Sequence, residues 1–420
     1  MAQQADRSVP VGRGIGRREF LRAAAFGATS ASALGALLGA CTRSPITSAT
    51  TVPPLSSGLP VERDATLRVY QWKDYLATNV LNAFTRRFAD ANIDVEVESF
   101  AQIDQGIARL QEPGAHFDVF FPTIDVLPDL IAAGFLRPLN HDYLPNVANL
   151  WSWFSDDGGP FYDPNLQFSV PYTVYSSGVG WRDDLVAATD APDADDPFAI
   201  FWNDRYRGRL GIYDAYLEAL SLALLRDGVT DLRSATDADL ERAAGALEEA
   251  IRVAGVRFTI DGAEEGLTEG EFAAHQAWSG DILTAPRYAA QEEPGTGARV
   301  GRELRYRAPR GPGLVVGCDL TAICAQGRNP VLAHAFLNHL LDFDTAMDNF
   351  TWNGYQPPLK GVTREAFADR SFPWHAAVPT NLLDAVLSED AFGQGQMLVG
   401  FGPSERARWL DQWNRVAPAT

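Results

Sequence analysis

Between residues 67 and 121 the chain alternates short apolar runs with stretches of mixed polarity. Residues 67–72 and 117–121 are typical of buried strands, and residues 93–97 alternate as a half-buried strand does. Between them, residues 80–88 and 102–110 have the composition of amphipathic helices. The order strand, helix, strand, helix, strand predicts a parallel sheet with helices on both faces, because parallel strands need long crossover connections.

Sheets of this kind bind ligands outside the carboxyl ends of their strands. Here those ends are residues 71–75 and residues 122–125, which carry aromatic, polar and acidic side chains. No glycine-rich phosphate loop follows the first strand, so a nucleotide ligand is disfavoured.

A second α/β block is predicted from about residue 178 to residue 310. The expected elements there and beyond are a strand at 210–214, helices at 216–225 and 237–253, a long strand at 314–325, a helix at 330–343 and a short amphipathic helix at 404–416. The chain is long enough for two domains with substantial cores.

The first 41 residues resemble an export signal rather than part of a fold. Arg17 and Arg18 precede an uncharged Ala/Gly-rich stretch, which indicates the twin-arginine export route. The ending at Cys41 resembles the bacterial lipobox, in which that thiol is lipidated after cleavage. The alternatives are a plain signal peptide with a chance cysteine and, less favoured because the stretch is barely hydrophobic, a transmembrane helix. Residues 42–64, which begin Ser/Thr/Pro-rich, predict a flexible tether.

Charge and cysteine content narrow the classes of function. The 54 acidic and 35 basic residues give a formal net charge of −19. Residues 1–41 hold five arginines and two acids, so the remainder carries −22. This balance argues against nucleic acid and against a basic lipid-binding face. Cys318 and Cys324 lie in one predicted strand, roughly 20 Å apart, so they cannot pair and are expected to be buried apolar residues.

Common catalytic and metal-binding motifs are absent from the sequence. The sequence has no nucleophile elbow, zinc-protease motif or phosphate loop, and its histidines show no ligand spacing. Instead, aromatic residues stand beside single carboxylates near predicted strand ends. These residues are Trp72, Asp74, Tyr75, Trp278, Asp281, Asp319 and Tyr355. Such sets recognise ammonium groups by ion pairing and cation–π attraction, although each aromatic taken alone also suits core packing.

Six segments in order resemble motifs of the substrate-binding proteins of bacterial spermidine/putrescine ABC transporters. The resemblance covers nearly all of residues 67–416. The segments are 70–75 (YQWKDY), 117–123 (FDVFFPT), 169–172 (SVPY), 206–210 (YRGRL), 269–281 (ending WSGD) and 353–357 (NGYQP). Their order behind an export signal makes a chance match to this family a poor explanation.

The resemblance implies an α/β fold of the two-lobed periplasmic-binding-protein type (type II). Each lobe would be a mixed sheet flanked by helices, with the ligand cleft between the lobes. Residues 65–176 plus 319–358 would form lobe 1, and residues 177–318 plus 359–420 would form lobe 2. It also implies a lipid-anchored monomer, periplasmic or at the cell surface, that is not an enzyme, needs no cofactor or metal, and hands a polyamine to an ABC permease.

The resemblance also implies a set of ligand-binding positions. They are Trp72, Asp74, Tyr75, Thr123, Asp125, Glu218, Trp278, Asp281, Asp319, Tyr355 and Gln396. Trp72, Tyr75 and Trp278 would contact the methylenes, and the carboxylates would pair with the amines.

Four positions depart from the family pattern: Lys73 replaces a small residue, Gly317 an aromatic, Asp125 a tyrosine and Ala215 an acid. Lys73 keeps a second hypothesis open, in which the same fold binds a zwitterionic amino acid-like compound, an opine or a sugar acid. A third hypothesis is a secreted enzyme or sensor partner on this scaffold, for which the sequence gives no nucleophile–base pair.

Overall fold

The computed structural model describes residues 52–155, 160–260, 262–285, 304–370, 380–398 and 402–416. The predicted export signal, with Cys41, lies outside these residues. In this part of the chain, no helix is both long and apolar enough to cross a membrane. The described residues all belong to one compact unit.

Three parallel strands confirm the sheet predicted for the first block: β1 (Thr66–Trp72), β2 (Asp94–Phe100) and β3 (Val119–Phe120). Val69 at the centre of β1 pairs with Val97 of β2 and Val119 of β3. The helices α2 (Thr78–Arg87) and α3 (Ile103–Leu110) supply the crossovers. Both strands that flank β1 run parallel to it, so the carboxyl ends of all three strands meet at one edge.

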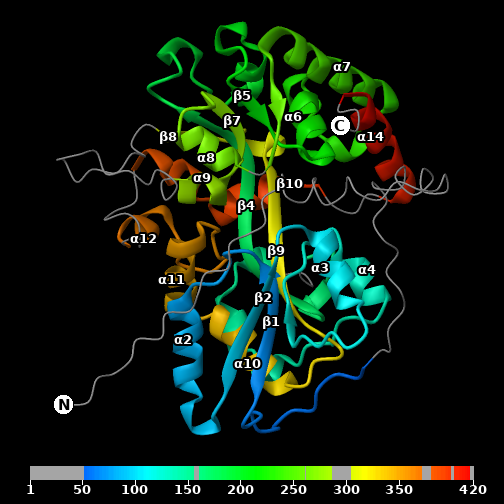
Figure 1. Ribbon diagram of the computed structural model, residues 1–420, viewed down its shortest axis with the longest axis vertical. Coiled ribbons are helices and arrows are strands. Elements are labelled where there is room, and N and C mark those ends of the chain that lie inside the picture. Colours follow the sequence, from blue (N-terminus) through cyan, green and yellow to red (C-terminus); the bar gives the residue numbers. More distant parts are fainter. Residues whose placement is uncertain are drawn as a thin grey trace, which may run out of the picture. The chain divides into compact units, whose positions relative to one another are not determined.

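Two long antiparallel strands, β4 (Ser169–Arg182) and β9 (Val315–Ile323), run through the middle of the sheet and join two groups of elements (Figure 1). The sheet order is β2-β1-β3-β9-β4-β7-β5-β6, with β10 (Gln396–Met397) on β9 and β8 (Leu304–Arg307) on β4. Lobe 1 here denotes β1–β3 with their helices, and lobe 2 denotes β5–β7 with theirs. Every residue of β9 is buried, as its continuous apolar sequence predicts.

Lobe 2 contains β5 (Leu210–Ile212), β6 (Arg257–Phe258) and β7 (Ala274–Trp278), covered by α6 (Tyr216–Arg226), α7 (Asp237–Ala254) and α14 (Pro403–Val416). A capping box between Thr236 and Asp239 starts α7, and Gly255 in the left-handed conformation ends it. The predicted helices at 216–225 and 237–253 are confirmed within one residue at each end.

The other α-helices of the described residues are α4 (Leu127–Ala132), α5 (Ser152–Ser155), α8 (Ala263–Thr268), α9 (Ser279–Thr284), α10 (Pro330–Leu340), α11 (Phe343–Asn353), α12 (Arg364–Ala368) and α13 (Glu389–Gln394). Short 3-10 helices occupy 89–91, 141–143, 145–149, 164–166, 188–190, 197–202, 204–206, 232–234, 311–313 and 380–385.

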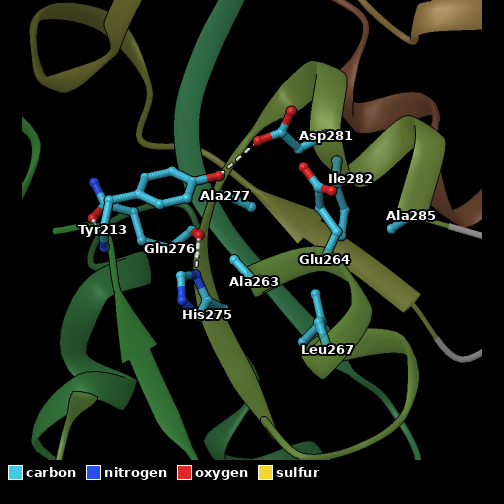
Figure 2. Close-up of a pocket in the computed structure, with 10 residues that line it drawn as sticks. All are labelled: Tyr213, Ala263, Glu264, Leu267, His275, Gln276, Ala277, Asp281, Ile282 and Ala285. Carbon is cyan, nitrogen blue, oxygen red and sulfur yellow. Dashed lines mark hydrogen bonds between the residues drawn. The ribbon is translucent and has the colours of Figure 1, made fainter. Parts of the chain in front are cut away.

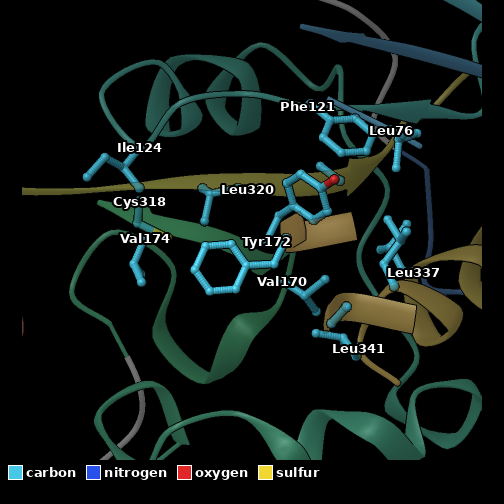
Figure 3. Packing of buried hydrophobic residues seen from close by; sticks show 14 of the residues in the cluster. Leu76, Phe121, Ile124, Val170, Tyr172, Val174, Cys318, Leu320, Leu337 and Leu341 are labelled. Atoms are coloured by element: carbon cyan, nitrogen blue, oxygen red, sulfur yellow. The ribbon is translucent and has the colours of Figure 1, made fainter. Parts of the chain in front are cut away.

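Lobe 1 has its own apolar core on the face of β4 and β9 turned toward α10. Tyr172 packs edge-on against Phe121, with ring centroids 4.9 Å apart, and Figure 3 shows both rings beside Leu320 and Leu337. Cys318 is buried here without a disulfide, and so is Cys324, as predicted. Side chains alternate between the two faces of a strand, so the residues packed on this face determine which side chains of β4 and β9 lie on the opposite face.

Residues 52–64 do not form the free tether predicted for 42–64. The Glu62 carboxylate accepts hydrogen bonds from the backbone N–H groups of Val331 and Leu332 at the start of α10, at 3.0 and 2.7 Å. The backbone N–H of Leu59 donates to the Tyr143 hydroxyl at 2.7 Å. The described part of the segment therefore lies against lobe 1, because its polar groups satisfy donors and acceptors there.

The predicted boundary between lobes at residue 358 is also displaced. Leu359, Val362 and Phe367 belong to the same core cluster as β1 and α10, and Phe367 stacks on Phe350 of α11 at 4.0 Å. The chain thus stays with lobe 1 through α12, and of the segment 359–420 it is α14 that packs on α6 and α7.

Candidate functional site

A cleft of about 710 Å³ opens where the strand ends of lobe 1 face β7 and α9. This volume is in the range of small-molecule sites. Its lining residues are Trp72, Lys73, Asp74, Tyr75, Phe100, Ala101, Thr123, Tyr175, Ile260, Gly262, Glu264, Glu265, Trp278, Asp281, Thr284, Asp319, Asn353 and Tyr355. Eight predicted positions are among them: Trp72, Asp74, Tyr75, Thr123, Trp278, Asp281, Asp319 and Tyr355.

The loop after β1 is fixed by hydrogen bonds to a single carbonyl. The Tyr75 carbonyl accepts from the Tyr172 hydroxyl at 2.7 Å, from Asn349 Nδ2 at 3.0 Å and from Asn353 Nδ2 at 3.1 Å. Asp74, just before it, has a positive φ of 62°, an uncommon conformation for a residue with a side chain. These contacts hold Trp72, Asp74 and Tyr75 at the cleft wall.

Asp319 lies on β9 at the floor of the cleft and is 5% exposed. It accepts a short hydrogen bond from the Tyr75 hydroxyl. Burial raises the pKa of the Asp319 carboxyl to about 7; the Tyr75 hydrogen bond opposes that rise, and the charges of Asp125 and Asp281 add to it. A cation at Asp319 would relieve this burial cost.

Asp281 is the centre of a second polar cluster, at the start of α9. Its Oδ1 accepts from the Tyr355 hydroxyl at 2.5 Å and its Oδ2 from the Tyr213 hydroxyl at 2.9 Å. Figure 2 shows Tyr213 reaching from β5 toward Asp281. The cavity drawn there holds about 10 Å³, enough for about one water. The larger cleft, which shares Asp281, is therefore the candidate ligand site.

Residues of lobe 2 contact the Trp278 indole both at its ring face and at its ring nitrogen. Tyr213 stacks on the indole with centroids 4.3 Å apart. Glu218 Oε1 accepts from Trp278 Nε1 at 2.8 Å and from Ser177 Oγ at 3.0 Å, and its Oε2 accepts from Gln276 Nε2 at 3.0 Å. Glu218 was predicted to bind ligand, but it lies outside the lining residues and supports Trp278 from behind.

A glycine permits the close contact between Trp278's turn and Tyr355. A Cβ built on Gly280 would lie 2.5 Å from two ring carbons of Tyr355. The sequence Trp278-Ser279-Gly280-Asp281 therefore brings an aromatic, a carboxylate and the Tyr355 ring to one point.

Thr123 and Asp125 follow β3. Thr123 forms an isolated bridge with Asp319 of β9, and its hydroxyl donates to Asp125. Asp125, another predicted binding position, is outside the lining residues. It acts on the site through its charge, which contributes to the raised pKa of Asp319.

Gln396 is not at the cleft, contrary to prediction. Its Oε1 accepts from the backbone N–H of Leu232 at 2.9 Å, and its Nε2 donates to the carbonyls of Thr230 and Pro312. The side-chain amide thus joins β10 to loops of lobe 2, and Gln396 is not among the residues that line the cleft.

Sequence reasoning missed several lining residues. Tyr175 on β4 was not among the predicted positions, although an aromatic residue in an otherwise small or aliphatic stretch was a usable signal. Glu264 and Glu265 on α8 looked like any exposed acidic pair. Asn353 was part of a quoted motif, but its role in holding Tyr75 depends on contacts between segments far apart in the chain.

The lining is aromatic and strongly acidic. Five carboxylates (Asp74, Glu264, Glu265, Asp281 and Asp319) face the cleft with one lysine, Lys73. Successive rings are close: Trp72 to Tyr75 at 6.5 Å, Tyr75 to Tyr355 at 5.5 Å, Tyr355 to Tyr175 at 5.8 Å and Tyr175 to Trp278 at 6.0 Å. We call these five rings the aromatic belt. Among the described residues, no group of acidic, histidine or cysteine side chains has a metal-binding arrangement.

The sequence matches a known protein family and several characterised proteins. The model for the family described as bacterial extracellular solute-binding protein matches residues 79–374. A putrescine/agmatine-binding protein of Pseudomonas aeruginosa is 25% identical over 297 residues, which is 69% of this chain and 77% of that protein. The spermidine/putrescine-binding periplasmic protein of Escherichia coli is 24% identical over 296 residues, with shares of 70% and 77%.

The fold agrees with that of a solved structure. The crystal structure of the spermidine/putrescine ABC transporter substrate-binding protein PotD of Streptococcus pneumoniae matches with a TM-score of 0.68 and 19% identity, over 84% of this chain and 98% of that one. The predicted α/β periplasmic-binding-protein fold is confirmed by this match.

Proposed function

This chain belongs to the bacterial extracellular solute-binding proteins, and from that premise we propose that its cleft captures a polyamine for an ABC importer. The observation that carries the proposal is the arrangement of Asp319 and Asp281 at the aromatic belt. The two carboxylates lie on different elements, β9 and α9, and both line the cleft. The names of the sequence relatives support the same ligand class.

The physical chemistry of a polyamine suits these surfaces. Each ammonium taken out of water needs a carboxylate or several acceptors, and the methylenes between them favour flat apolar faces. Asp319 and Asp281 would take ammonium groups, while Tyr355 and Trp278 would contact the chain between them. The remaining predicted positions, Trp72, Asp74, Tyr75 and Thr123, would complete the wall at lobe 1.

Closure of the lobes on the ligand and transfer to permease subunits are part of the proposal. Continuous strands β4 and β9 connect the lobes, and short movements in such connections produce hinge closure. No histidine or cysteine is among the described residues that line the cleft, and we propose a transport role without catalysis.

Calorimetry on the signal-cleaved protein tests the ligand class. Putrescine, spermidine and spermine would each be titrated at pH 8, with glutamate and a neutral sugar as controls. We expect at least one polyamine to bind with micromolar or tighter affinity and to raise the melting temperature. No heat and no thermal shift with all three would contradict the proposal.

A zwitterionic ligand is the second candidate, because Lys73 is exposed at the cleft lining. Its ammonium would take a carboxylate of an amino acid-like compound, an opine or a sugar acid, while Asp281 or Asp319 took the amine. Mass spectrometry of ligand released from freshly purified protein discriminates the two. A carboxylate-bearing species would favour this candidate, and a plain polyamine would exclude it.

We also propose export by the twin-arginine route and lipidation at Cys41, outside the described residues. Replacing Cys41 with serine should move the protein from the membrane fraction to the soluble exported fraction, because the acyl chains supply the anchor. Fractionation with immunoblotting measures this. Replacing Arg17 and Arg18 with lysines is the matched test of the route and should retain the protein in the cytoplasm. An unchanged membrane association of Cys41→Ser would contradict lipidation.

A further inference from the structure

We propose that Tyr175, which no motif assigned to ligand binding, hydrogen-bonds the same ligand ammonium that Asp319 pairs with, and so selects for a ligand whose ammonium group carries at least two N–H bonds. The inference rests on the proposed function. It starts from the pairing of β4 with β9, in which Tyr175 lies directly opposite Gly317 and Thr173 opposite Asp319.

This register puts Tyr175 and Asp319 on one face of the sheet. Gly317 and Asp319 are two residues apart on β9, so they point to the same side, and Tyr175 shares that side as the cross-strand partner of Gly317. Both Tyr175 and Asp319 line the cleft. They are thus diagonal neighbours on the cleft floor.

Glycine at position 317 provides the space that Tyr175 fills. A Cβ built on Gly317 would overlap Cζ, Cε2 and the hydroxyl of Tyr175. The ring therefore lies across the Gly317 backbone, between Trp278 and Tyr355, meeting both edge-on at 60° and 88°. Any larger residue at 317 would push the ring out of the aromatic belt.

The Tyr175 hydroxyl differs from the hydroxyls of the neighbouring tyrosines because it has no hydrogen-bond partner among the described residues. The Tyr75 and Tyr355 hydroxyls donate to Asp319 and Asp281. Tyr175 makes no such hydrogen bond within that part of the chain, although burial and, after it, the charge of Asp319 keep its pKa high. A neutral phenol oxygen beside a buried carboxylate is a ready acceptor for an ammonium N–H.

The consequence is a chemical requirement on the ligand. An ammonium shared between the Asp319 carboxylate and the Tyr175 oxygen must donate two hydrogen bonds. Primary and secondary ammonium groups have the N–H groups for this, and a tertiary ammonium has one.

The test measures binding of putrescine and of N,N,N′,N′-tetramethylputrescine to wild type and to Tyr175→Phe. We expect Tyr175→Phe to bind putrescine about tenfold more weakly, the effect of one hydrogen bond to a charged group. The ratio of its affinity for putrescine to its affinity for the tetramethyl compound should fall by about the same factor. The melting temperature without ligand should stay within about 2 °C, because the hydroxyl has no internal partner among the described residues. Tyr206→Phe, in lobe 2, is the control and should leave affinity unchanged.

Gly317→Ala tests the packing. It should weaken putrescine binding by about 30-fold or more in the wild-type background and by less than about twofold in Tyr175→Ala, since the overlapping atoms are then absent. Gly245→Ala on α7, where a Cβ has open space, is its control. If Gly317→Ala fails to fold, Tyr175→Phe alone decides. Wild-type affinity in Tyr175→Phe would overturn this inference while leaving the proposed function standing; no polyamine binding by wild type would overturn both.

Discussion

Replacing Asp319 with asparagine should weaken polyamine binding by about 100-fold or more and, at the same time, raise the melting temperature of the unliganded protein. The loss of affinity follows from removing the negative charge that would pair with a buried ligand ammonium. Such an interaction typically contributes several kcal/mol. Asparagine keeps the shape and can still accept the Tyr75 hydrogen bond. The change therefore removes charge with little other disturbance.

The gain in stability follows from the raised pKa of the buried carboxyl. Burial moves the pKa of Asp319 from 3.8 to about 7. Between these values the folded state holds a proton that the unfolded state has lost, so the free energy of unfolding falls as pH rises from about 4 to 7. At pH 8 the penalty amounts to at most about 4 kcal/mol, at 1.36 kcal/mol per pH unit. A neutral amide at position 319 has no such penalty.

Calorimetric titration and thermal melts of Asp319→Asn at pH 8 and pH 4 measure both effects. We expect the melting temperature to rise by several degrees at pH 8 and by little at pH 4. Asp344→Asn on α11, whose side chain is 83% exposed, is the control and should change neither property. A variant that loses both binding and stability at pH 8 would show that Asp319 has a structural role instead.

The parts of the site that could be predicted lie in short segments that contain both the residues that identify a strand or helix and the side chains that face the cleft. Trp72 ends the strand β1 and Asp74 and Tyr75 follow it, while Trp278 and Asp281 lie on either side of a strand-to-helix turn. At such places the strand end determines where the side chains go. The fold was predictable for a similar reason, because strands and helices each place apolar residues at a characteristic spacing along the chain.

The parts that could not be predicted depend on register or on contacts between distant segments. Tyr175 becomes a cleft residue because β4 pairs with β9 in the register that sets it opposite Gly317. Gln396 was transferred from the family by position along the chain, and the structure shows its amide bonded to Leu232 and two neighbouring carbonyls. Glu218 was predicted to bind ligand, but its carboxylate accepts a hydrogen bond from the Trp278 ring nitrogen and does not line the cleft.

The raised pKa of Asp319 also predicts how binding depends on pH. In the free protein the carboxyl, with a pKa of about 7, is protonated below that pH, whereas an ammonium requires it ionised. Below pH 7 the ligand must displace a proton, so affinity should fall about tenfold per pH unit; above pH 7 it should level off. Between pH 8 and pH 5 the expected loss is about 100-fold. Alkyl ammonium groups stay charged throughout, with pKa values near that of lysine.

The groups that face Asp319 sharpen this prediction. Burial keeps the pKa of Tyr75 and of Tyr175 well above the range from pH 5 to pH 8, so neither phenol releases the proton. The other neighbours are the carboxyls of Asp125 and Asp281, whose negative charges help to raise the Asp319 pKa.

Titration of putrescine from pH 5 to pH 8, in two buffers of different ionisation enthalpy, counts the protons released. The count should approach one at pH 5.5 and zero at pH 8, and the slope should largely disappear in Asp319→Asn. If wild-type affinity were instead independent of pH over this range, Asp319 would be ionised in the free cleft. The site would then have to bind its ligand without the gain that comes from neutralising a buried acid.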